Sequence, residues 1–438
     1  MREILPALSR WYAGGEPFGL ATVVAVSRSA PRDPGAAMAV GPGDEVVGSV
    51  SGGCVEGAVL ELAREVVASG EARLETFGYS DEDAFAVGLT CGGEITVLVR
   101  RVTPNEDPSF GAVADSVAAG RPVTVATVID GPAPRGATLV VRPDEERGAA
   151  EGGAGPPGFV VRPPDEEPGA AERGAGALGF ADRPDKEPGA AEEVAATPGP
   201  AVPPDQEPGA AEVLAGTLGP AGLDAAVAAD ARGELALGAT GLRHYGPNGE
   251  RREDDVTVFL HSFAPPPRML VFGAIDYAAA VARIGAFLGH RVTVCDARPV
   301  FATPERFPAG VEVVVDWPHR YLSGTDTDAR TVICVLTHDP KFDVPLLEEA
   351  LRRPAAYIGA MGSRRTHDER MRRLREAGVG ERELSRLRSP VGLDLGARTP
   401  EEVAVSVAAE IVALRWGGTG VPLTATAGAI HPTGTPAR

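Results

Sequence analysis

MLVFGAIDYAAAVARIGAFLGHRVTVCDARP, residues 269–299, predicts a strand, a turn, an amphipathic helix and a second strand in succession. Such a βαβ unit is the opening of a doubly wound α/β fold. Two further buried strands, each followed by a helical pattern, are expected at residues 331–338 and 355–360. We therefore expect a Rossmann-like domain over residues 265–420 and a flexible tail over residues 421–438.

The turn after the first of these strands departs from the dinucleotide-binding pattern G-x-G-x-x-G. Its three positions hold Gly273, Ile275 and Ala278, and the second glycine of the pattern is the one that lets a pyrophosphate approach the backbone. A β-branched Ile275 would stand where the phosphates should lie, although Asp296 ends the second strand where a ribose-binding acid belongs. The sequence therefore favours a structural Rossmann shell, or a differently placed ligand, over standard NAD(P) binding.

Two polar segments follow the later strands of this domain, at the carboxyl ends where open α/β sheets bind ligands. THDPKFD supplies His338, and GAMGSRRTH supplies Gly362, Ser363 and Arg364. A glycine and a serine directly before a helix can cradle a phosphate. The alternative is that Ser363 is a helix N-cap and that His338 is a loop histidine satisfied within the protein.

Two helices are expected beyond these loops. The arginine-rich run at residues 364–375 is interpreted as one helix with a solvated face, with a phosphate or partner contact as the alternative. The second helix begins near Pro400, with Thr399 and Glu402 in the positions of a capping box. Its apolar residues at helical spacing, of which Leu414 is the last, predict a core face.

The N-terminal block, residues 1–142, alternates short strands with helical segments. A helix is predicted at residues 54–69 by apolar residues at helical spacing. Residues 223–264, which follow an insertion, are expected to complete this domain. Strands are predicted by runs rich in valine, isoleucine and threonine at residues 20–28, 45–50, 94–102 and 122–130.

SGGCVEGAV, residues 51–59, places two glycines at the end of a strand and a cysteine in the first turn of a helix. Gly52 and Gly53 let backbone amides approach a ligand closely, and a helix N-terminus favours anions, a thiolate among them. Cys54 is therefore the best candidate for a thiolate. The alternative is that Cys54 is a small buried hydrophobe and that Glu56 belongs to a capping arrangement.

A second glycine-flanked cysteine, Cys91 in LTCGGEITV, starts a predicted strand and could bring a second thiol to the same edge. Two thiols beside anion-binding backbone suit a ligand that offers phosphate, sulfur and a soft metal. Arg28 and Arg32 in the loop RSAPRDPG are further candidate anion contacts. The four cysteines have no CxxC spacing, so neither a disulfide scaffold nor a structural zinc site is expected.

Four near-copies of one phrase, PDEERGAAE, PDEEPGAAE, PDKEPGAAE and PDQEPGAAE, begin at Pro143, Pro164, Pro184 and Pro204. A period near 20 residues is typical of solenoids, but the copies lack an apolar face. Because so little buriable surface cannot offset the entropy of ordering, we predict a disordered insertion at residues 143–222. This segment holds 16 acidic and 5 basic residues, so it carries most of the formal net charge of −19.

The remaining composition argues against several classes of protein. No stretch of 18 apolar residues exists, and the first residues have no cleavable signal pattern, so a soluble cytoplasmic protein without membrane contact is expected. No basic stripe with interleaved aromatic residues is present. Nucleic acid is therefore not expected as a partner.

Several long motifs together resemble the XdhC/CoxI family, accessory proteins that handle molybdenum cofactor for xanthine and carbon monoxide dehydrogenases. GGCVEGAV and CGGEITV look like the family's N-terminal domain. FATPERFP, THDPKFD, YIGAMGSRRTH and PVGLDLGARTPEEVAVSVAAEI look like its C-terminal Rossmann domain. The likeness covers nearly the whole chain outside residues 143–222, although many relatives have a GAGH-type loop where this chain has GAID at residues 273–276.

The resemblance implies a chaperone, more than an enzyme, that binds molybdenum cofactor and helps it acquire a terminal sulfido ligand from a cysteine desulfurase. It implies delivery of the cofactor to the large subunit of an apo-xanthine dehydrogenase or apo-carbon monoxide dehydrogenase. Cys54 would contact the metal or dithiolene region of the cofactor, with Gly52, Gly53 and Glu56 shaping the pocket. A homodimer is also expected.

Two other functions stay as alternatives. An NAD(P)-dependent oxidoreductase would bind its nicotinamide cofactor at the Gly273 loop. A thiol-based sulfur carrier would form a persulfide on Cys54, with Cys91 as the resolving thiol.

Overall fold

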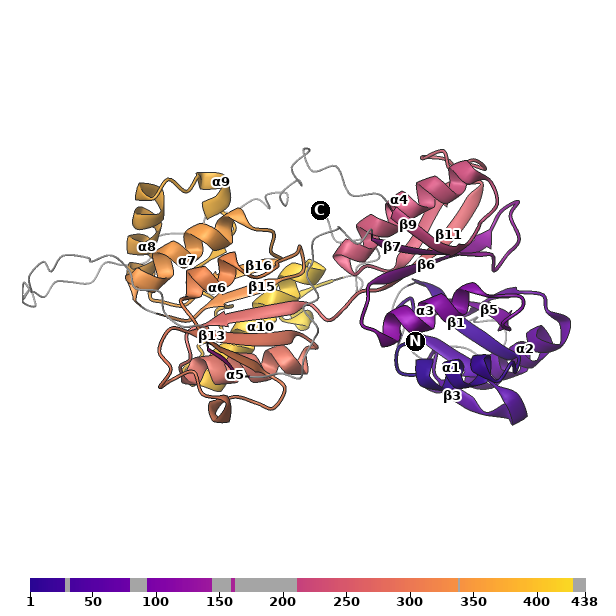
Figure 1. Ribbon diagram of the computed structural model, residues 1–438, viewed down its shortest axis with the longest axis horizontal. Helices are drawn as coiled ribbons and strands as arrows, with labels where there is room; N and C mark the ends of the chain where they lie inside the picture. Colours follow the sequence, from indigo (N-terminus) through magenta and orange to yellow (C-terminus); the bar gives the residue numbers. More distant parts are fainter. Residues whose placement is uncertain (28–31, 79–92, 144–158, 162–210, 338, 428–438) are drawn as a thin grey trace, which may run out of the picture.

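The computed structural model of the 438-residue chain describes residues 1–27, 32–78, 93–143, 159–161, 211–337 and 339–427. Its elements form two bodies joined by the short segment 264–267 (Figure 1). One body contains two antiparallel sheets, and the other is built on a parallel sheet. Within the described part of the chain, every helix is too short or too polar to cross a lipid bilayer.

The first antiparallel sheet has the strand order β3-β2-β1-β5-β4 and is covered on both faces. In β1, Ala21 faces the helix α2, whereas its neighbour Leu20 packs with the helices α1 and α3. This alternation explains why both faces of β1 are apolar. The elements are α1 (Leu5–Ala13), β1 (Phe18–Ser27), β2 (Ala37–Val40), η1 (Pro42–Asp44), β3 (Val46–Gly48), α2 (Glu56–Ser69), β4 (Arg73–Phe77), β5 (Glu94–Val102) and α3 (Ser109–Ala118).

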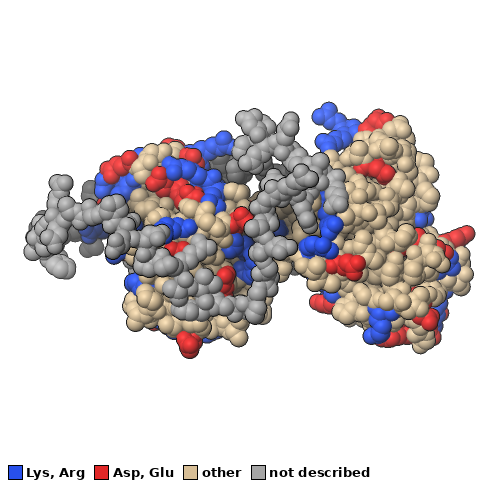
Figure 2. Space-filling view, viewed as in Figure 1, with Lys and Arg blue, Asp and Glu red and all other residues tan. Residues whose placement is uncertain are grey.

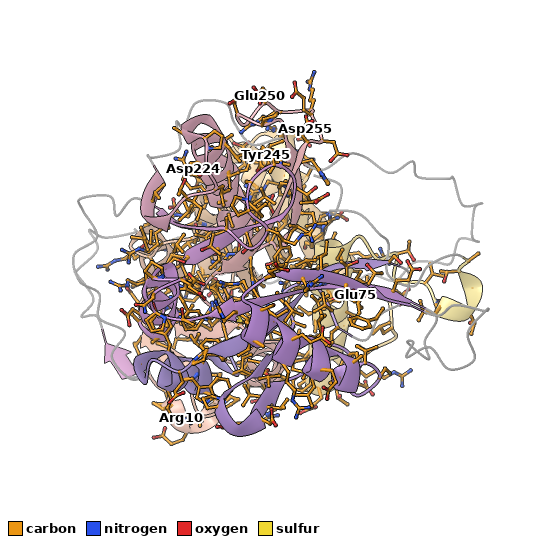
Figure 3. All side chains as sticks on the ribbon, turned by 90° about the vertical axis from the view of Figure 1, so that its right-hand side faces the viewer. Arg10, Glu75, Asp224, Tyr245, Glu250 and Asp255 are labelled. Carbon is orange, nitrogen blue, oxygen red and sulfur yellow. The ribbon has the colours of Figure 1, made fainter. Side chains whose placement is uncertain are left out.

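The second antiparallel sheet has the order β10-β11-β6-β7-β9, and one long helix, α4, packs on it. The strand predicted at residues 122–130 belongs to this sheet and not to the first one. Figure 3 shows Glu250 and Asp255 at its outer end, far from Arg10 on α1. The elements are β6 (Val123–Asp130), β7 (Thr138–Pro143), β9 (Ala211–Gly216), α4 (Ala221–Leu237), β10 (Gly241–Tyr245) and β11 (Val256–Phe263).

The structure differs from the predicted insertion at residues 143–222 near its ends. β9 pairs with β7 in the second sheet, and α4 begins at Ala221. A short strand, β8 (Phe159–Val161), pairs in parallel with the edge of the other body's sheet. Pairing with a neighbouring strand can order such a segment, because it satisfies the backbone N–H and C=O groups whatever the side-chain composition. Residues 144–158 and 162–210 of the predicted insertion lie outside the described residues.

The parallel sheet of the second body has the order β17-β16-β15-β12-β13-β14-β8. Starting from β12, the chain builds outward on one side and then on the other, which is the doubly wound order predicted from the sequence. Its strands are β12 (Arg268–Phe272), β13 (Arg291–Asp296), β14 (Glu312–Val315), β15 (Val332–Val335), β16 (Tyr357–Ala360) and β17 (Leu387–Arg388).

Helices cover both faces of this parallel sheet, as Figure 1 shows. α10 begins with the predicted capping box of Thr399 and Glu402. The predicted core face of this helix is wrong at Leu414, which is 44% exposed because it lies beyond the part of α10 that packs on α5. The helices are α5 (Asp276–Phe287), η2 (Pro304–Arg306), α6 (Pro318–Ser323), α7 (Pro340–Arg352), α8 (Arg364–Glu376), α9 (Glu381–Leu384), α10 (Pro400–Trp416) and η3 (Leu423–Ala425).

Candidate functional site

The loop between β3 and α2 folds around the carboxylate of Glu56. Oε1 accepts hydrogen bonds from the hydroxyl of Ser49 at 2.6 Å and from the backbone N–H groups of Ser51 and Gly52, both at 2.9 Å. Oε2 accepts from the hydroxyl of Ser51 at 2.5 Å and from the N–H of Gly53 at 2.8 Å. The side chain of Glu56, the first residue of α2, therefore holds the preceding loop in place through hydrogen bonds.

These hydrogen bonds keep Glu56 ionised. Burial alone would raise the pKa of this carboxyl group, but the hydroxyls of Ser49 and Ser51 and the backbone amides together lower its pKa from 4.5 to about 2. A lowered pKa in the folded state means that the carboxylate stabilises the fold above the ordinary pKa. That stabilisation is lost as the pH falls towards the folded-state pKa.

The role of the two glycines differs from the one expected. The N–H groups of Gly52 and Gly53 donate to Glu56, so these amides are already hydrogen-bonded within the loop. Both residues have positive φ, at 80° and 122°, which residues with a side chain rarely adopt. Both glycines are exposed, and a Cβ atom on either would meet no atom of the described residues within 4 Å.

Cys54 lies in this loop, two residues before the first residue of α2. Its N–H donates to the hydroxyl of Ser51 at 2.9 Å, and the same hydroxyl accepts from the N–H of Val55 at 3.0 Å. The side chain is half-buried and packs against the core between α2 and the first sheet. Cys54 is thus neither a fully buried hydrophobe nor a fully exposed thiol. Cys295 and Cys334 are buried in the other body.

Three of the predicted site residues, Cys91, His338 and Arg28, lie outside the described residues. A second thiol beside Cys54 therefore stays a prediction. Arg32 is described and is exposed to solvent.

Asp296 ends β13 at the predicted position, but its carboxylate is fully engaged. Oδ1 accepts from the backbone N–H and the Nε of Arg298, both at 2.9 Å. Oδ2 accepts from Nη2 of Arg298 at 2.8 Å and from the N–H of Ala274 at 2.7 Å. Burial opposes ionisation, yet these hydrogen bonds and the charge of Arg298 lower the pKa of Asp296 below its ordinary value.

The glycine of the turn after β12 is needed for packing. Gly273 has a φ of 105°, and a Cβ atom there would lie 2.8 Å from Cγ2 of Thr337. The loop after β12 thus packs directly against the loop after β15. Ile275 is partly buried and packs against the core on the α5 face of the sheet.

The alternative interpretation of Ser363 is confirmed. Its hydroxyl caps α8 by accepting the N–H of Thr366 at 3.1 Å, and it lies 2.9 Å from the hydroxyl oxygen of Thr366. Gly362 has a φ of 151°, and Arg364 is exposed at the start of the helix. A helix cap accounts for this segment without a ligand.

The sequence did not predict a buried ion pair that joins three loops at the carboxyl edge of the parallel sheet. Arg370 on α8 is 4% exposed and donates to Asp343 at 3.0 Å, to the carbonyl oxygen of Met361 at 2.8 Å and to the hydroxyl of Ser389 at 2.9 Å. Asp343 also accepts a hydrogen bond from the hydroxyl of Thr337. These partners connect the segments that follow β15, β16 and β17. Arg370 is also the exception to the solvated face predicted for α8.

Metal-binding groups and charge distribution do not point to a further site in the views and residues described. No three His, Cys, Asp or Glu side chains among them gather as a metal-binding group. On the face shown in Figure 2, basic and acidic side chains are interspersed over both bodies. The half-buried Cys54 beside an open glycine loop is therefore the strongest candidate site that the described chain offers.

Two family models match the parts of the chain that carry most of the candidate residues. The model described as the XdhC Rossmann domain matches residues 269–411. The model described as the XdhC and CoxI family matches residues 11–78, which include the Cys54 loop.

Curated relatives match part of the chain. It is 32% identical over 165 residues to an uncharacterized protein, YqeB, of Escherichia coli K12, covering 36% of this chain and 29% of that protein. It is 32% identical over 163 residues to a probable xanthine dehydrogenase subunit of Bacillus subtilis 168, covering 37% and 47%. It is 30% identical over 169 residues to the molybdenum cofactor insertion chaperone PaoD of E. coli K12, covering 39% and 46%. The matches span less than half the length of each relative.

The fold has a counterpart among solved structures. The crystal structure of a xanthine dehydrogenase from Bacillus halodurans superposes with a TM-score of 0.59 at 20% sequence identity, covering 97% of both chains. At this identity the likeness concerns the fold alone. Models of the XdhC and CoxI family thus match one segment in each body of the chain, residues 11–78 and residues 269–411.

Proposed function

We propose that this protein is an accessory chaperone that binds molybdenum cofactor and inserts it into a molybdoenzyme of the xanthine dehydrogenase or carbon monoxide dehydrogenase type. Two of its relatives support this role, because one is named as a molybdenum cofactor insertion chaperone and the other as part of a xanthine dehydrogenase. The observation that carries the proposal is the half-buried thiol of Cys54 beside the exposed residues Gly52 and Gly53.

The chemistry of this loop fits a cargo that contains sulfur and a soft metal. A cysteine sulfur is a soft ligand and suits such a metal better than a hard oxygen donor does. In this proposal a flat ligand would approach that sulfur over Gly52 and Gly53, which are exposed and carry no side chain. We therefore assign Cys54 as the residue that contacts the metal or dithiolene region of the cargo.

Glu56 has a different role in this proposal. Both of its carboxylate oxygens already accept hydrogen bonds from the loop itself. Glu56 is therefore a positioning residue that fixes the backbone on which Cys54 stands. It does not need to touch the cargo.

The proposal also includes the state in which the cargo is delivered. The protein would hold the cofactor while a cysteine desulfurase supplies its terminal sulfido ligand. The apo-dehydrogenase would then receive the sulfurated cofactor. Holding the cargo at a half-buried site would limit its contact with water during this step.

Transfer to a client enzyme tests the proposed function. The protein is loaded anaerobically with released, sulfurated cofactor, freed of excess by gel filtration, and mixed with apo-xanthine dehydrogenase. We expect xanthine oxidation to appear with the loaded wild-type protein and to be at least tenfold lower with Cys54→Ala. Cys295→Ala, which changes a cysteine in the other body, serves as the matched control. If loaded wild-type protein restores no activity beyond that of the same cofactor added alone, the proposed function is wrong.

A further inference from the structure

Asp296 occupies the position at which Rossmann domains recognise a ribose. An ionised carboxylate has about four lone-pair positions for hydrogen bonds. Asp296 uses four, three on donors of Arg298 and one on the N–H of Ala274. The residue is 2% exposed, so the engaged carboxylate is also screened from solvent. No acceptor position is left for the hydroxyls of a ribose.

Arg298 is held over this carboxylate from two directions. Its Nε and Nη2 bind the two carboxylate oxygens, at 2.9 and 2.8 Å, in the bidentate geometry that guanidinium and carboxylate groups prefer. Its guanidinium also lies 4.5 Å from the ring centroid of Phe301, a distance at which cations attract aromatic faces. The side chain is 44% exposed, so it sits between the acid and the solvent from which a ligand would arrive.

The same carboxylate also removes a donor from the turn after β12. In dinucleotide-binding loops, backbone amides at this turn and at the following helix N-terminus face the phosphates. Here the N–H of Ala274 donates to Asp296 at 2.7 Å. One internal contact therefore consumes both an acceptor for the ribose and an amide beside the phosphate position.

We propose that Arg298 is a specificity-determining residue of the Rossmann crevice. By saturating Asp296 it excludes ligands that must be held by a ribose diol at the end of β13, which is the class of NAD, NADP and ADP-ribose. The crevice is thereby reserved for ligands that carry no ribose at this position. This goes beyond the proposed chaperone role and does not depend on it.

The test uses ADP-ribose, the part of a dinucleotide that carries the diol and the pyrophosphate, titrated by calorimetry into the full-length protein. All variants carry Ile275→Gly, which supplies the second glycine of the dinucleotide-binding pattern. We expect Ile275→Gly alone to show no saturable binding up to millimolar ADP-ribose. Adding Arg298→Ala should produce binding at least tenfold tighter than that limit, and adding Asp296→Asn to this pair should abolish it.

Arg306→Ala is the matched control. Arg306 lies 5.7 Å from the same Phe301 ring, but its Nη2 donates to Asp276 at 3.1 Å. Its removal leaves Asp296 saturated, so Ile275→Gly with Arg306→Ala should not bind ADP-ribose. The proposal is overturned if Ile275→Gly alone binds as tightly as the Arg298→Ala combination, or if that combination, folded by circular dichroism, does not bind.

Discussion

The two ends of this molecule both carry an acid beside a glycine turn, and both acids are engaged within the protein, but by different donors. Glu56 is surrounded by neutral donors, the hydroxyls and amides of its own loop. Asp296 is held mainly by a cation, Arg298. The loop around Glu56 has exposed glycines beside the thiol of Cys54, whereas the Arg298 side chain lies between Asp296 and solvent. The position of an acidic residue at a known ligand-binding site therefore does not show whether its carboxylate can bind a ligand; its hydrogen-bond partners within the protein decide this.

The same contrast extends to the energetic cost of losing a partner. In the same body as Asp296, the parallel sheet has the buried pair of Arg370 and Asp343, whose side chains are 3% and 5% exposed. Removing one charge from such a pair leaves the other buried without compensation. Removing Glu56 leaves only neutral donors behind, and two of these, the amides of Gly52 and Gly53, belong to exposed residues.

The largest effect is therefore expected from Arg370→Met. Because the variant leaves Asp343 buried without its cation, the free energy of unfolding should fall by about 3–5 kcal/mol. Urea unfolding followed by circular dichroism measures this loss. The control is Arg372→Met on the same helix, whose partners Glu369 and Glu376 are exposed, and it should change stability little. Equal losses of unfolding free energy in both variants would show that the buried ion pair stabilises the protein no more than the exposed pairs do.

A smaller effect is expected from Glu56→Gln. The amide keeps only one accepting oxygen, so the donors on the other position, such as the Ser51 hydroxyl and the Gly53 N–H on Oε2, lose their partner. We expect a loss of about 1–3 kcal/mol and faster hydrogen exchange of the loop amides. Glu61→Gln, an exposed position on the same helix, is the control and should leave the loop unchanged. Unchanged loop exchange in Glu56→Gln would contradict a positioning role.

The charge of Glu56 also predicts a pH dependence. Its pKa is about 2 in the folded protein and ordinarily 4.5, so its stabilising contribution should be complete above pH 4.5 and should disappear as the pH falls towards 2. The difference in melting temperature between wild type and Glu56→Gln should shrink over this range. A difference that stays constant from about pH 6 to about pH 2.5 would show that the charge is not the stabilising feature.

The smallest effects separate backbone conformation from space in the Cys54 loop. A Cβ atom at Gly52 or at Gly57 would meet no atom of the described residues within 4 Å, but Gly52 has a φ of 80° and Gly57 lies in α2. Gly52→Ala should therefore destabilise the protein by about 1 kcal/mol, whereas Gly57→Ala should stabilise it by about 0.5 kcal/mol. Thermal unfolding of the two variants checks the sign. A loss of stability in both variants would show that steric contacts of the added methyl group, and not the backbone conformation, determine the effect.

Features that depend on local pattern were predictable from the sequence. The doubly wound sheet follows from the strand and helix periods of residues 269–299, and the capping box at Thr399 follows from residue type and spacing. Ser363 was expected as either a phosphate contact or an N-cap, and the structure shows the N-cap. In each case the deciding interaction lies within a few residues along the chain.

Features that depend on contacts between distant segments were not predictable. Asp296 was placed correctly at the end of its strand, but its saturation requires Ala274 from another turn. Arg370 looks like one of many arginines on α8, and only its spacing of four from the buried Leu374 hinted at an inward side chain. The pairing of β9 with β7 joins segments on either side of a long insertion. The local sequence of either segment does not predict such pairings.

The most direct test of the proposed site is cofactor retention. Wild-type protein, Cys54→Ala and Cys295→Ala are incubated anaerobically with released molybdenum cofactor and gel-filtered, and the co-eluting pterin and molybdenum are quantified. We expect near-stoichiometric retention by wild type and Cys295→Ala, and at least a tenfold loss in Cys54→Ala. Equal retention by all three would contradict the assignment of Cys54, and no retention by a folded wild type would contradict the chaperone itself.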